Sequence, residues 1–364
     1  MSKITFLCFQ NTIENAKVSL NFINLNIAAK EDDMASLKEV AKLAGVSLMT
    51  VSRAINNPEQ LSEKTLARVK QAIEQLGYVP NIAAKKIRGV SNNTIGVLSF
   101  STATTPFSVE ILLAIEQTVR KYGWNSFVIN AFEDNPQDVE QAVDLLLSHR
   151  PTAIIIARHG LKEINVPKRL AAYPMVLANC VTQDIEVASY TPDDFQGQAD
   201  VMSLLVEKGY KKPLCLYIPH NAIAAQKRQE GLHTVWFSQK NAHPLTEFFM
   251  EESDDYLHGA DELKKLLEQG VEHFDYDVIV CGNDRIALLA YQMLLAKGLR
   301  IPQDVAVVGY DNMVGVAHLF LPPLTTVQLP HYEMGKQAAL HLIEGRKGKN
   351  TYPIECPLVV RESC

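Results

Sequence analysis

The chain has 364 residues, of which 47% are hydrophobic and 21% are charged, and its formal net charge is −6 at pH 7. This length predicts two or three domains, and the balanced composition excludes a disordered or collagen-like chain. No apolar run reaches the ~18 residues of a membrane-spanning helix, and the six cysteines show no paired, metal-binding spacing. We therefore expect a cytoplasmic protein with free thiols and without a membrane partner, a metal or a cofactor.

Residues 1–33 precede the first helical pattern. Their apolar stretch ITFLCF is short, and the polar residues after it include no small-residue cleavage site, which argues against a secretory signal. Helical periodicity begins just after Met34. We therefore expect residues 1–33 to be a non-native or disordered extension and Met34 to be the natural start.

Charge is divided unevenly along the chain. Residues 34–93 carry nine Lys and Arg against four Asp and Glu, whereas the chain after residue 93 is acidic overall. A basic segment attached to an acidic body predicts that a polyanion contacts that segment alone. Chance clustering of charge on a solvated helix is the alternative.

Two short helical patterns, LKEVAKLA (37–44) and LMTVSRAIN (48–56), adjoin across one tight turn. Gly45 is suited to end the first helix in a left-handed conformation, and the Ser47 hydroxyl is suited to cap the second. Two helices joined in this way resemble a helix-turn-helix. An ordinary αα-hairpin inside a larger helical domain is the alternative.

Each of these helices is expected to have a narrow apolar stripe. Val40 and Leu43 in the first helix, and Val51 and Ile55 in the second, are spaced so that each pair lies on one helix face. Small residues between them, Ala41 and Ala44, would permit close contact between the helices.

A third helix is predicted after Ser62, which is placed to cap it, and Gly77 and Pro80 would end it. Three helices of this size can close one small core. The next segment, NIAAKKIRG (81–89), is basic and so short that it would form a helix only on a partner, because isolated helices under ~12 residues are marginal in water.

From Thr94 onwards, apolar runs alternate with helical stretches. The runs are TIGVLSF, NSFVINAF, TAIIIAR, PMVLANC, PLCLYIP, YDVIVCG and DVAVVGY. The helical stretches between them include VEILLAIEQTVRKYG, DVEQAVDLLLSH and RIALLAYQMLLAKG. Apolar strands separated by crossover helices predict parallel α/β sheets, and the length of this region predicts two of them.

Motifs of common enzymes are missing from the sequence. It contains no GxGxxG after a strand, no Walker-type glycine loop, no GxSxG and no HExxH. An α/β body of this kind is more simply interpreted as a binding protein than as an enzyme.

Polar residues follow several of the predicted strands, where ligands of open α/β sheets bind. Asn179 follows PMVLA, Asn283 follows YDVIVCG, and Asp311 follows DVAVVGY. Amides and carboxylates suit the hydroxyls of a sugar, although Asn and Asp are also common as helix caps in these places. Arg228 would by default be a solvated helix charge.

Three motifs together resemble the lactose-repressor/galactose-repressor family of bacterial regulators. They are VAKLAGVSLMTVSRAIN (40–56), VVGYDN (307–312) and PPLTTVQ (322–328). The resemblance extends from Ser36 to the carboxyl terminus and implies a sequence-specific DNA-binding repressor that a sugar releases from its operator.

The family pattern implies an α/β fold class with an added amino-terminal helical domain. Residues 34–80 would form a helix-turn-helix DNA-binding domain, and residues 81–93 a hinge helix and linker. Residues 94–364 would form an effector-binding and dimerisation core of two parallel α/β subdomains, like a periplasmic binding protein. The first subdomain would comprise residues 94–192 and 330–357, and the second would comprise residues 193–328 and 358–364.

The resemblance also implies which residues contact double-stranded operator DNA. The helix that begins at Leu48 would enter the major groove, where Arg53 could read guanine and Leu48 and Met49 could contact thymine methyls. The hinge would act in the minor groove, and its Ile87 stands where the family usually has leucine. All DNA-binding candidates are Ser36, Ser47, Leu48, Met49, Ser52, Arg53, Asn56, Ser62, Thr65, Asn81, Ala84, Lys85 and Ile87.

The implied effector contacts are Phe107, Asn179, Arg228, Asn283 and Asp311. Further similarity within the family implies sucrose as the effector; another sugar, a purine, or a sugar-binding protein without DNA function are the alternatives. Glu133 stands where the lactose repressor has an arginine, which argues against a shared effector. Because no heptad-bearing tail follows VVRESC, we expect a homodimer.

Overall fold

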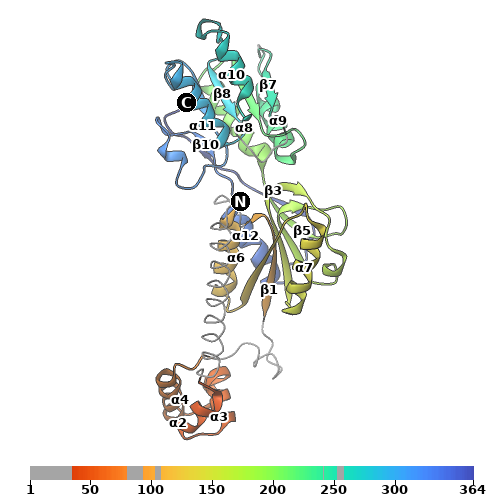
Figure 1. Ribbon diagram of the computed structural model, residues 1–364, viewed down its shortest axis with the longest axis vertical. Helices are drawn as coiled ribbons and strands as arrows, with labels where there is room; N and C mark the ends of the chain where they lie inside the picture. Colours follow the sequence, from red (N-terminus) through yellow and green to blue (C-terminus); the bar gives the residue numbers. More distant parts are fainter. Residues whose placement is uncertain (1–34, 80–92, 103–107, 241, 252–257) are drawn as a thin grey trace, which may run out of the picture. The chain divides into compact units, whose positions relative to one another are not determined.

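The structure is a computed structural model that describes residues 35–79, 93–102, 108–240, 242–251 and 258–364 (Figure 1). The chain forms two compact units, residues 1–92 and residues 93–364, and each is described by itself. The extension at 1–33 and the hinge predicted within 81–93 lie outside the described residues, except for Asn93.

The first unit is helical. Its elements are α2 (Leu37–Ala44), α3 (Leu48–Asn56), the 3₁₀ turn η1 (Pro58–Gln60) and α4 (Glu63–Leu76). The hydroxyls of Ser36, Ser47 and Ser62 accept hydrogen bonds from backbone N–H groups in the first turns of α2, α3 and α4. Gly45 and Gly77 end α2 and α4 with φ of 61° and 57°, conformations that glycine adopts without strain. The predicted caps and helix ends are confirmed.

One small core closes this unit. Its buried residues are Val40, Ala41, Ala44, Val51, Val69 and Ala72. The expectation that Leu43 belongs to the apolar stripe is wrong, since its side chain is 50% exposed. In so short a helix the buried face is centred on Val40, Ala41 and Ala44, and Leu43 lies about a quarter turn away from that centre.

The second unit contains two parallel sheets, as predicted. The larger has six strands in the order β11-β5-β4-β3-β1-β2. These are β1 (Thr94–Phe100), β2 (Asn125–Ala131), β3 (Ala153–Glu163), β4 (Met175–Val181), β5 (Ala188–Pro192) and β11 (Thr351–Ile354). The smaller has four strands in the order β7-β6-β8-β9. These are β6 (Pro213–Tyr217), β7 (Thr246–Phe249), β8 (Val278–Cys281) and β9 (Ala306–Val308).

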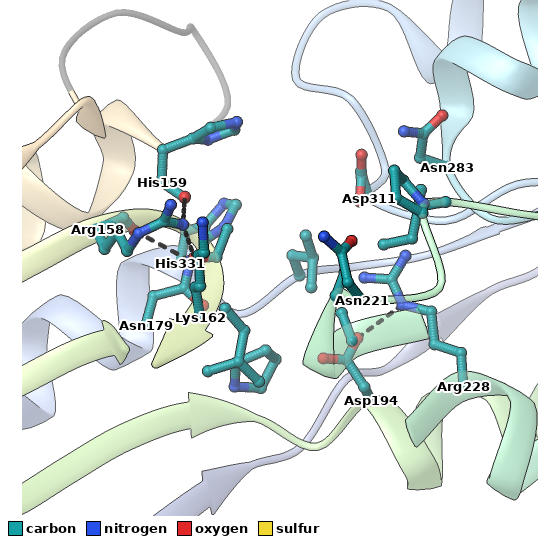
Figure 2. Close-up of a pocket in the computed structure, with 18 of the residues that line it drawn as sticks. Arg158, His159, Lys162, Asn179, Asp194, Asn221, Arg228, Asn283, Asp311 and His331 are labelled. Atoms are coloured by element: carbon teal, nitrogen blue, oxygen red, sulfur yellow. Dashed lines mark hydrogen bonds and ion pairs between the residues drawn. The ribbon is translucent and has the colours of Figure 1, made fainter. Parts of the chain in front are cut away.

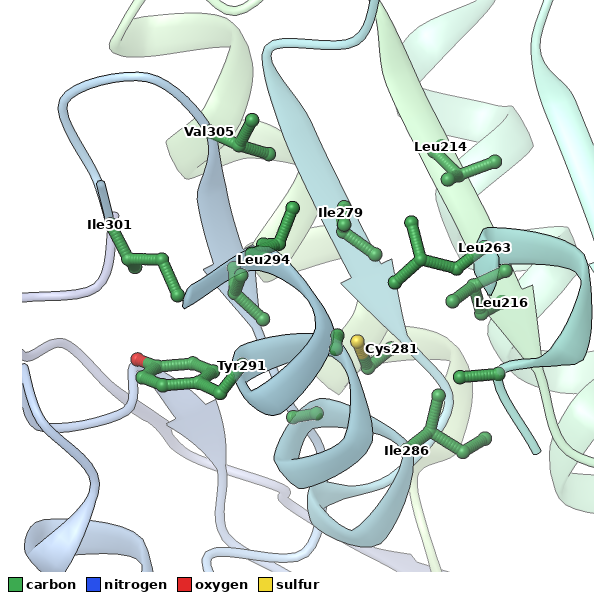
Figure 3. Packing of buried hydrophobic residues seen from close by; sticks show 14 of the residues in the cluster. Leu214, Leu216, Leu263, Ile279, Cys281, Ile286, Tyr291, Leu294, Ile301 and Val305 are labelled. Carbon is green, nitrogen blue, oxygen red and sulfur yellow. The ribbon is translucent and has the colours of Figure 1, made fainter. Parts of the chain in front are cut away.

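Helices cover both faces of each sheet. They are α6 (Val109–Lys121), α7 (Pro136–Ser148), α8 (Asp194–Glu207), α9 (Ile223–Trp236), α10 (Asp261–Glu268), α11 (Asp284–Ala296) and α12 (His331–Ile343). Short 3₁₀ turns are η3 (Lys168–Leu170), η5 (Val271–His273) and η6 (Ala317–Leu319). On the larger sheet, α6 and α12 pack on one face and α7 on the other. On the smaller sheet, α10 and α11 pack on one face and α8 and α9 on the other (Figure 3).

The chain passes between the two sheets three times. It leaves β5 to enter α8, it leaves the short strand β10 (Thr326–Val327) to enter α12, and it leaves β11 to enter β12 (Leu358–Val359). Strands β10 and β12 pair antiparallel beside the smaller sheet. The connections bring the carboxyl ends of strands from both sheets to one cavity, which is the site described next.

Candidate functional site

The outer face of α3 carries large side chains that do not take part in the core. Leu48 and Met49 are 43% and 64% exposed, whereas Val51, on the opposite face, is buried. The exposed Arg53 guanidinium lies against Met49, with Nη2 3.6 Å from Sδ. Two apolar side chains and a fork of N–H donors therefore share one exposed surface of a short helix.

The other DNA-binding candidates in the described residues are already engaged in local hydrogen bonds. Asn56 Nδ2 donates to the Ser52 carbonyl at 2.9 Å. The hydroxyls of Ser62 and Thr65 lie 2.9 Å apart, and Ser36 forms a capping box with Glu39. The Ser36, Ser62 and Thr65 contacts fix the amino-terminal ends of α2 and α4, and the Asn56 contact lies in the last turn of α3. The candidates Asn81, Ala84, Lys85 and Ile87 lie outside the described residues, as does Phe107 in the second unit.

A cavity of about 510 Å³ opens between the carboxyl ends of the two sheets of the second unit. Figure 2 shows two facing walls. One carries Arg158, His159, Lys162, Asn179 and His331, and the other carries Asp194, Asn221, Arg228, Asn283 and Asp311. Four predicted effector contacts thus line one cavity: Asn179, Arg228, Asn283 and Asp311.

Arg228 is a buried ion-pair partner rather than a solvated helix charge. Its side chain, on α9, is 4% exposed, and its Nε donates to Asp194 Oδ1 at 2.8 Å. The guanidinium also lies 3.5 Å over the Tyr310 ring. Burial raises the pKa of the Asp194 carboxyl, although the neighbouring Arg228 cation opposes this shift. These contacts fix the guanidinium at the edge of the cavity.

Asn283 and Asp311 approach the cavity from two strand ends of the smaller sheet. Asn283 caps α11, since its Oδ1 accepts from the Ile286 N–H at 2.9 Å, and it also lines the cavity. The helix cap is confirmed, and the contact of Asn283 with a sugar stays a prediction. Asp311 has φ of 117°, and burial raises its pKa to about 8, while the Arg228 cation lowers it. Its carboxyl is mostly protonated at neutral pH and can then donate a hydrogen bond.

Asn179 lies within β4 rather than after it, because the strand continues to Val181. It is buried with φ of 60°, a left-handed conformation that Asn tolerates better than most residues. Its Nδ2 donates to the Arg158 carbonyl at 3.1 Å. The amide therefore connects β4 to β3 at the wall of the cavity.

Arg158 and Lys162 were not among the predicted contacts. The β3–β4 pairing shifts register between Ala157 and Lys162, so β3 bulges at this point. Bulges of this kind redirect side chains and are frequent beside binding sites. Arg158 Nε donates to Glu133 Oε2 at 2.7 Å, and Glu133 itself does not line the cavity.

Comparisons with known proteins agree with this geometry. Residues 36–81 match the model of bacterial regulatory proteins of the lacI family, and residues 92–362 match that of periplasmic binding proteins and the sugar binding domain of the LacI family. The chain belongs to the LacI family. It is 50% identical to the sucrose operon repressor of Escherichia coli over 90% of this chain and 99% of that protein.

Two solved structures of the lac repressor are also similar to this chain. The repressor bound to ONPG in its repressed state is 26% identical, with a TM-score of 0.76, over 91% of this chain and 100% of that one. The dimer bound to operator and the anti-inducer ONPF is 26% identical, with a TM-score of 0.74, over 91% of this chain and 99% of that one. Among the helices of the described residues, none is long and apolar enough to cross a membrane.

Proposed function

We propose that the protein is a dimeric transcriptional repressor of sucrose-utilisation genes, released from its operator by a sugar that binds in the cavity of residues 93–364. The main support is the combination, in one chain, of an exposed helix-turn-helix surface on α3 and a polar cavity at the ends of two parallel sheets. The identity of 50% to the sucrose operon repressor of Escherichia coli supports the choice of genes. We propose no catalytic role.

Operator recognition is assigned to the exposed face of α3 in the major groove. The Arg53 fork can donate two parallel hydrogen bonds to a guanine, which contributes ~1–3 kcal/mol of discrimination. Leu48 and Met49 can contact thymine methyl groups, which explains why two large apolar side chains remain exposed. Ser36, Ser62 and Thr65 are assigned to phosphates, which position the helix without reading sequence.

Sugar recognition is assigned to the polar groups of the cavity. Arg228, Asn283 and Asp311 lie on one wall and Asn179 on the other, so a bound sugar would contact both sheets at once. Binding would favour one relative arrangement of the sheets over another. The coupling of sugar and operator through that choice is typically ~1–3 kcal/mol and acts equally on both affinities.

The test is fluorescence anisotropy of the full chain with near-palindromic duplexes from upstream of the adjacent sugar genes. We expect specific binding that falls on addition of sucrose or one of its hydrolysis products. Specific binding that no sugar affects would overturn the sugar response and leave the repressor. Failure to prefer any sequence over random duplex at moderate salt would overturn the repressor assignment and favour a sugar-binding protein.

A further inference from the structure

The cavity carries more cationic than anionic side chains. Its lining includes four cations and two carboxyls: Arg158, Lys162, Arg228 and Arg285, against Asp194 and Asp311. Two imidazoles, His159 and His331, add further N–H groups. A neutral sugar presents hydroxyls alone and does not require this excess of positive charge.

Three of the four cations have an acidic neighbour. Arg228 pairs with the buried Asp194, and Arg158 pairs with Glu133 behind the cavity wall. The positive charge of Arg285 lowers the pKa of Asp311, although burial raises this pKa by more. Of the four, Lys162 is the cation with neither an ion pair nor a carboxyl that it is shown to act on among the described residues.

Lys162 lies on the bulged part of β3, and its side chain is exposed. Within the described part of the chain it forms no ion pair, although a lysine at a cavity wall could pair with any carboxylate in reach. Arg158, four residues earlier on the same wall, uses Nε and Nη1 for Glu133 and for the carbonyls of His159 and Gly160. Its Nη2 donors have no hydrogen bond to the described residues and remain for a ligand.

We propose that the effector is a phosphorylated sugar, whose phosphate monoester binds between Lys162 and Arg158 while its ring hydroxyls contact Arg228, Asn283 and Asp311 on the facing wall. The proposal rests on the proposed function, since it specifies the effector of the same cavity. A phosphate accepts charge-assisted hydrogen bonds from both an ammonium and a guanidinium. The volume of about 510 Å³ is within the range of small-ligand sites and fits a sugar with one phosphate.

Two features of the cavity support an anionic ligand. Asp194 is already paired with Arg228, and burial raises the pKa of Asp311 to about 8, so these carboxyls oppose an incoming anion less than their number indicates. On the opposite wall the Arg158 guanidinium is fixed by its hydrogen bonds, so a phosphate would meet a partly preorganised site.

The test is displacement of the full chain from its operator by matched pairs of ligands. Sucrose is compared with sucrose 6-phosphate, glucose with glucose 6-phosphate, and fructose with both fructose 1-phosphate and fructose 6-phosphate. Inorganic phosphate is the control for an anion without a sugar. We expect at least one phosphate monoester to act at a concentration about tenfold below that of its parent sugar, equivalent to ~1.4 kcal/mol. Calorimetry without DNA should give the same ratio of affinities.

Substitutions identify the residue responsible. Lys162→Gln should remove the advantage of the phosphorylated ligand and leave the parent sugar unchanged, whereas Lys162→Arg should retain most of it. Lys168→Gln is the matched control, since Lys168 is an exposed lysine on η3 that does not line the cavity. Its displacement curves should match those of the unsubstituted protein.

The two proposals fail in different ways. If a parent sugar displaces the operator as well as its phosphate does, or if Lys162→Gln leaves the preference intact, the phosphate proposal is overturned and the sugar response stands. If no ligand of either kind displaces the operator, both are overturned.

Discussion

The Asp311 carboxyl makes the stability of the protein depend on pH in a direction that can be worked out. Its pKa rises from 3.8 to about 8 on folding, mainly because burial removes the water that would solvate its charge. Between these pH values the unfolded chain has released this proton and the folded protein retains it. The folded state therefore binds more protons, and stability falls as pH rises through this window.

Asp311→Asn removes the ionisable group and keeps the side-chain shape. At 1.36 kcal/mol per pKa unit, the full shift would destabilise the folded state with an ionised Asp311 by at most about 6 kcal/mol. The carboxyl is only half-buried, and screening by water reduces this free energy to about 2 kcal/mol. Asn also tolerates the positive φ at this position. We expect the variant to match the unsubstituted protein near pH 4 and to be more stable by about 2 kcal/mol at pH 9, measured by urea unfolding across this range.

Asp304→Asn is a control of opposite sign. The exposed Asp304 has its pKa lowered to about 2 by hydrogen bonds from Arg300. The carboxylate therefore stabilises the folded protein above its unfolded pKa, and this stability is lost as pH falls towards 2. The control variant should be less stable at neutral pH. If Asp311→Asn instead lost stability at pH 9, or differed equally at every pH, burial of the carboxyl would not be the cause of the raised pKa.

Three further substitutions test the DNA-binding surface, the buried ion pair and the helix packing. Arg53→Ala should weaken specific operator binding by about 10- to 100-fold and reduce preference for one base, with thermal stability unchanged; equal loss on all sequences would contradict base reading. Arg228→Met leaves Asp194 buried without its cation, so unfolding in urea should show a loss of about 3–5 kcal/mol, and sugar should no longer displace the operator at temperatures where the variant is folded. An unchanged midpoint would contradict the pairing. Gly231→Ala places a Cβ 2.2 Å from the Phe195 carbonyl oxygen, so α8 and α9 must separate at a net cost of about 1–3 kcal/mol, detected as a lower melting temperature even though Ala favours helix.

Much of the fold could be predicted from the sequence because its strongest patterns are local. The seven apolar runs all contain strands, and the caps at Ser47 and Ser62 are where they were expected. The strands that were missed are short or polar. β5 reads ASYTP and β11 reads TYPI, so neither has the apolar run that indicates a buried strand. β5 is a strand because it pairs with β4, and β11 is a strand because it pairs with β5 at the edge of the sheet.

The site was harder to predict because its contacts are between distant parts of the chain. Asp194 and Arg228 are 34 residues apart and meet only because α8 packs against α9. Arg158 and Lys162 reach the cavity through a bulge in β3, and no local sequence pattern predicts that bulge. Asn179, Asn283 and Asp311 could be proposed from the sequence because each comes at or after an apolar run, and all three line the cavity.

The polar groups of the cavity also explain how a ligand could control a protein of this kind. Raised pKa values at Asp194 and Asp311 mean that the site holds carboxyls in surroundings that disfavour their charge, at a cost to stability. A ligand that hydrogen-bonds to residues of both walls at once reduces this loss of stability. It can do so only when the two walls are separated by the distance that the ligand spans. It therefore stabilises one arrangement of the two sheets more than any other, and this differential affinity is the sole source of a ligand-driven shift. By the same argument, a ligand that contacts a single wall would bind without releasing DNA, so the distribution of polar groups over both walls is the feature that makes the cavity suitable for a switch.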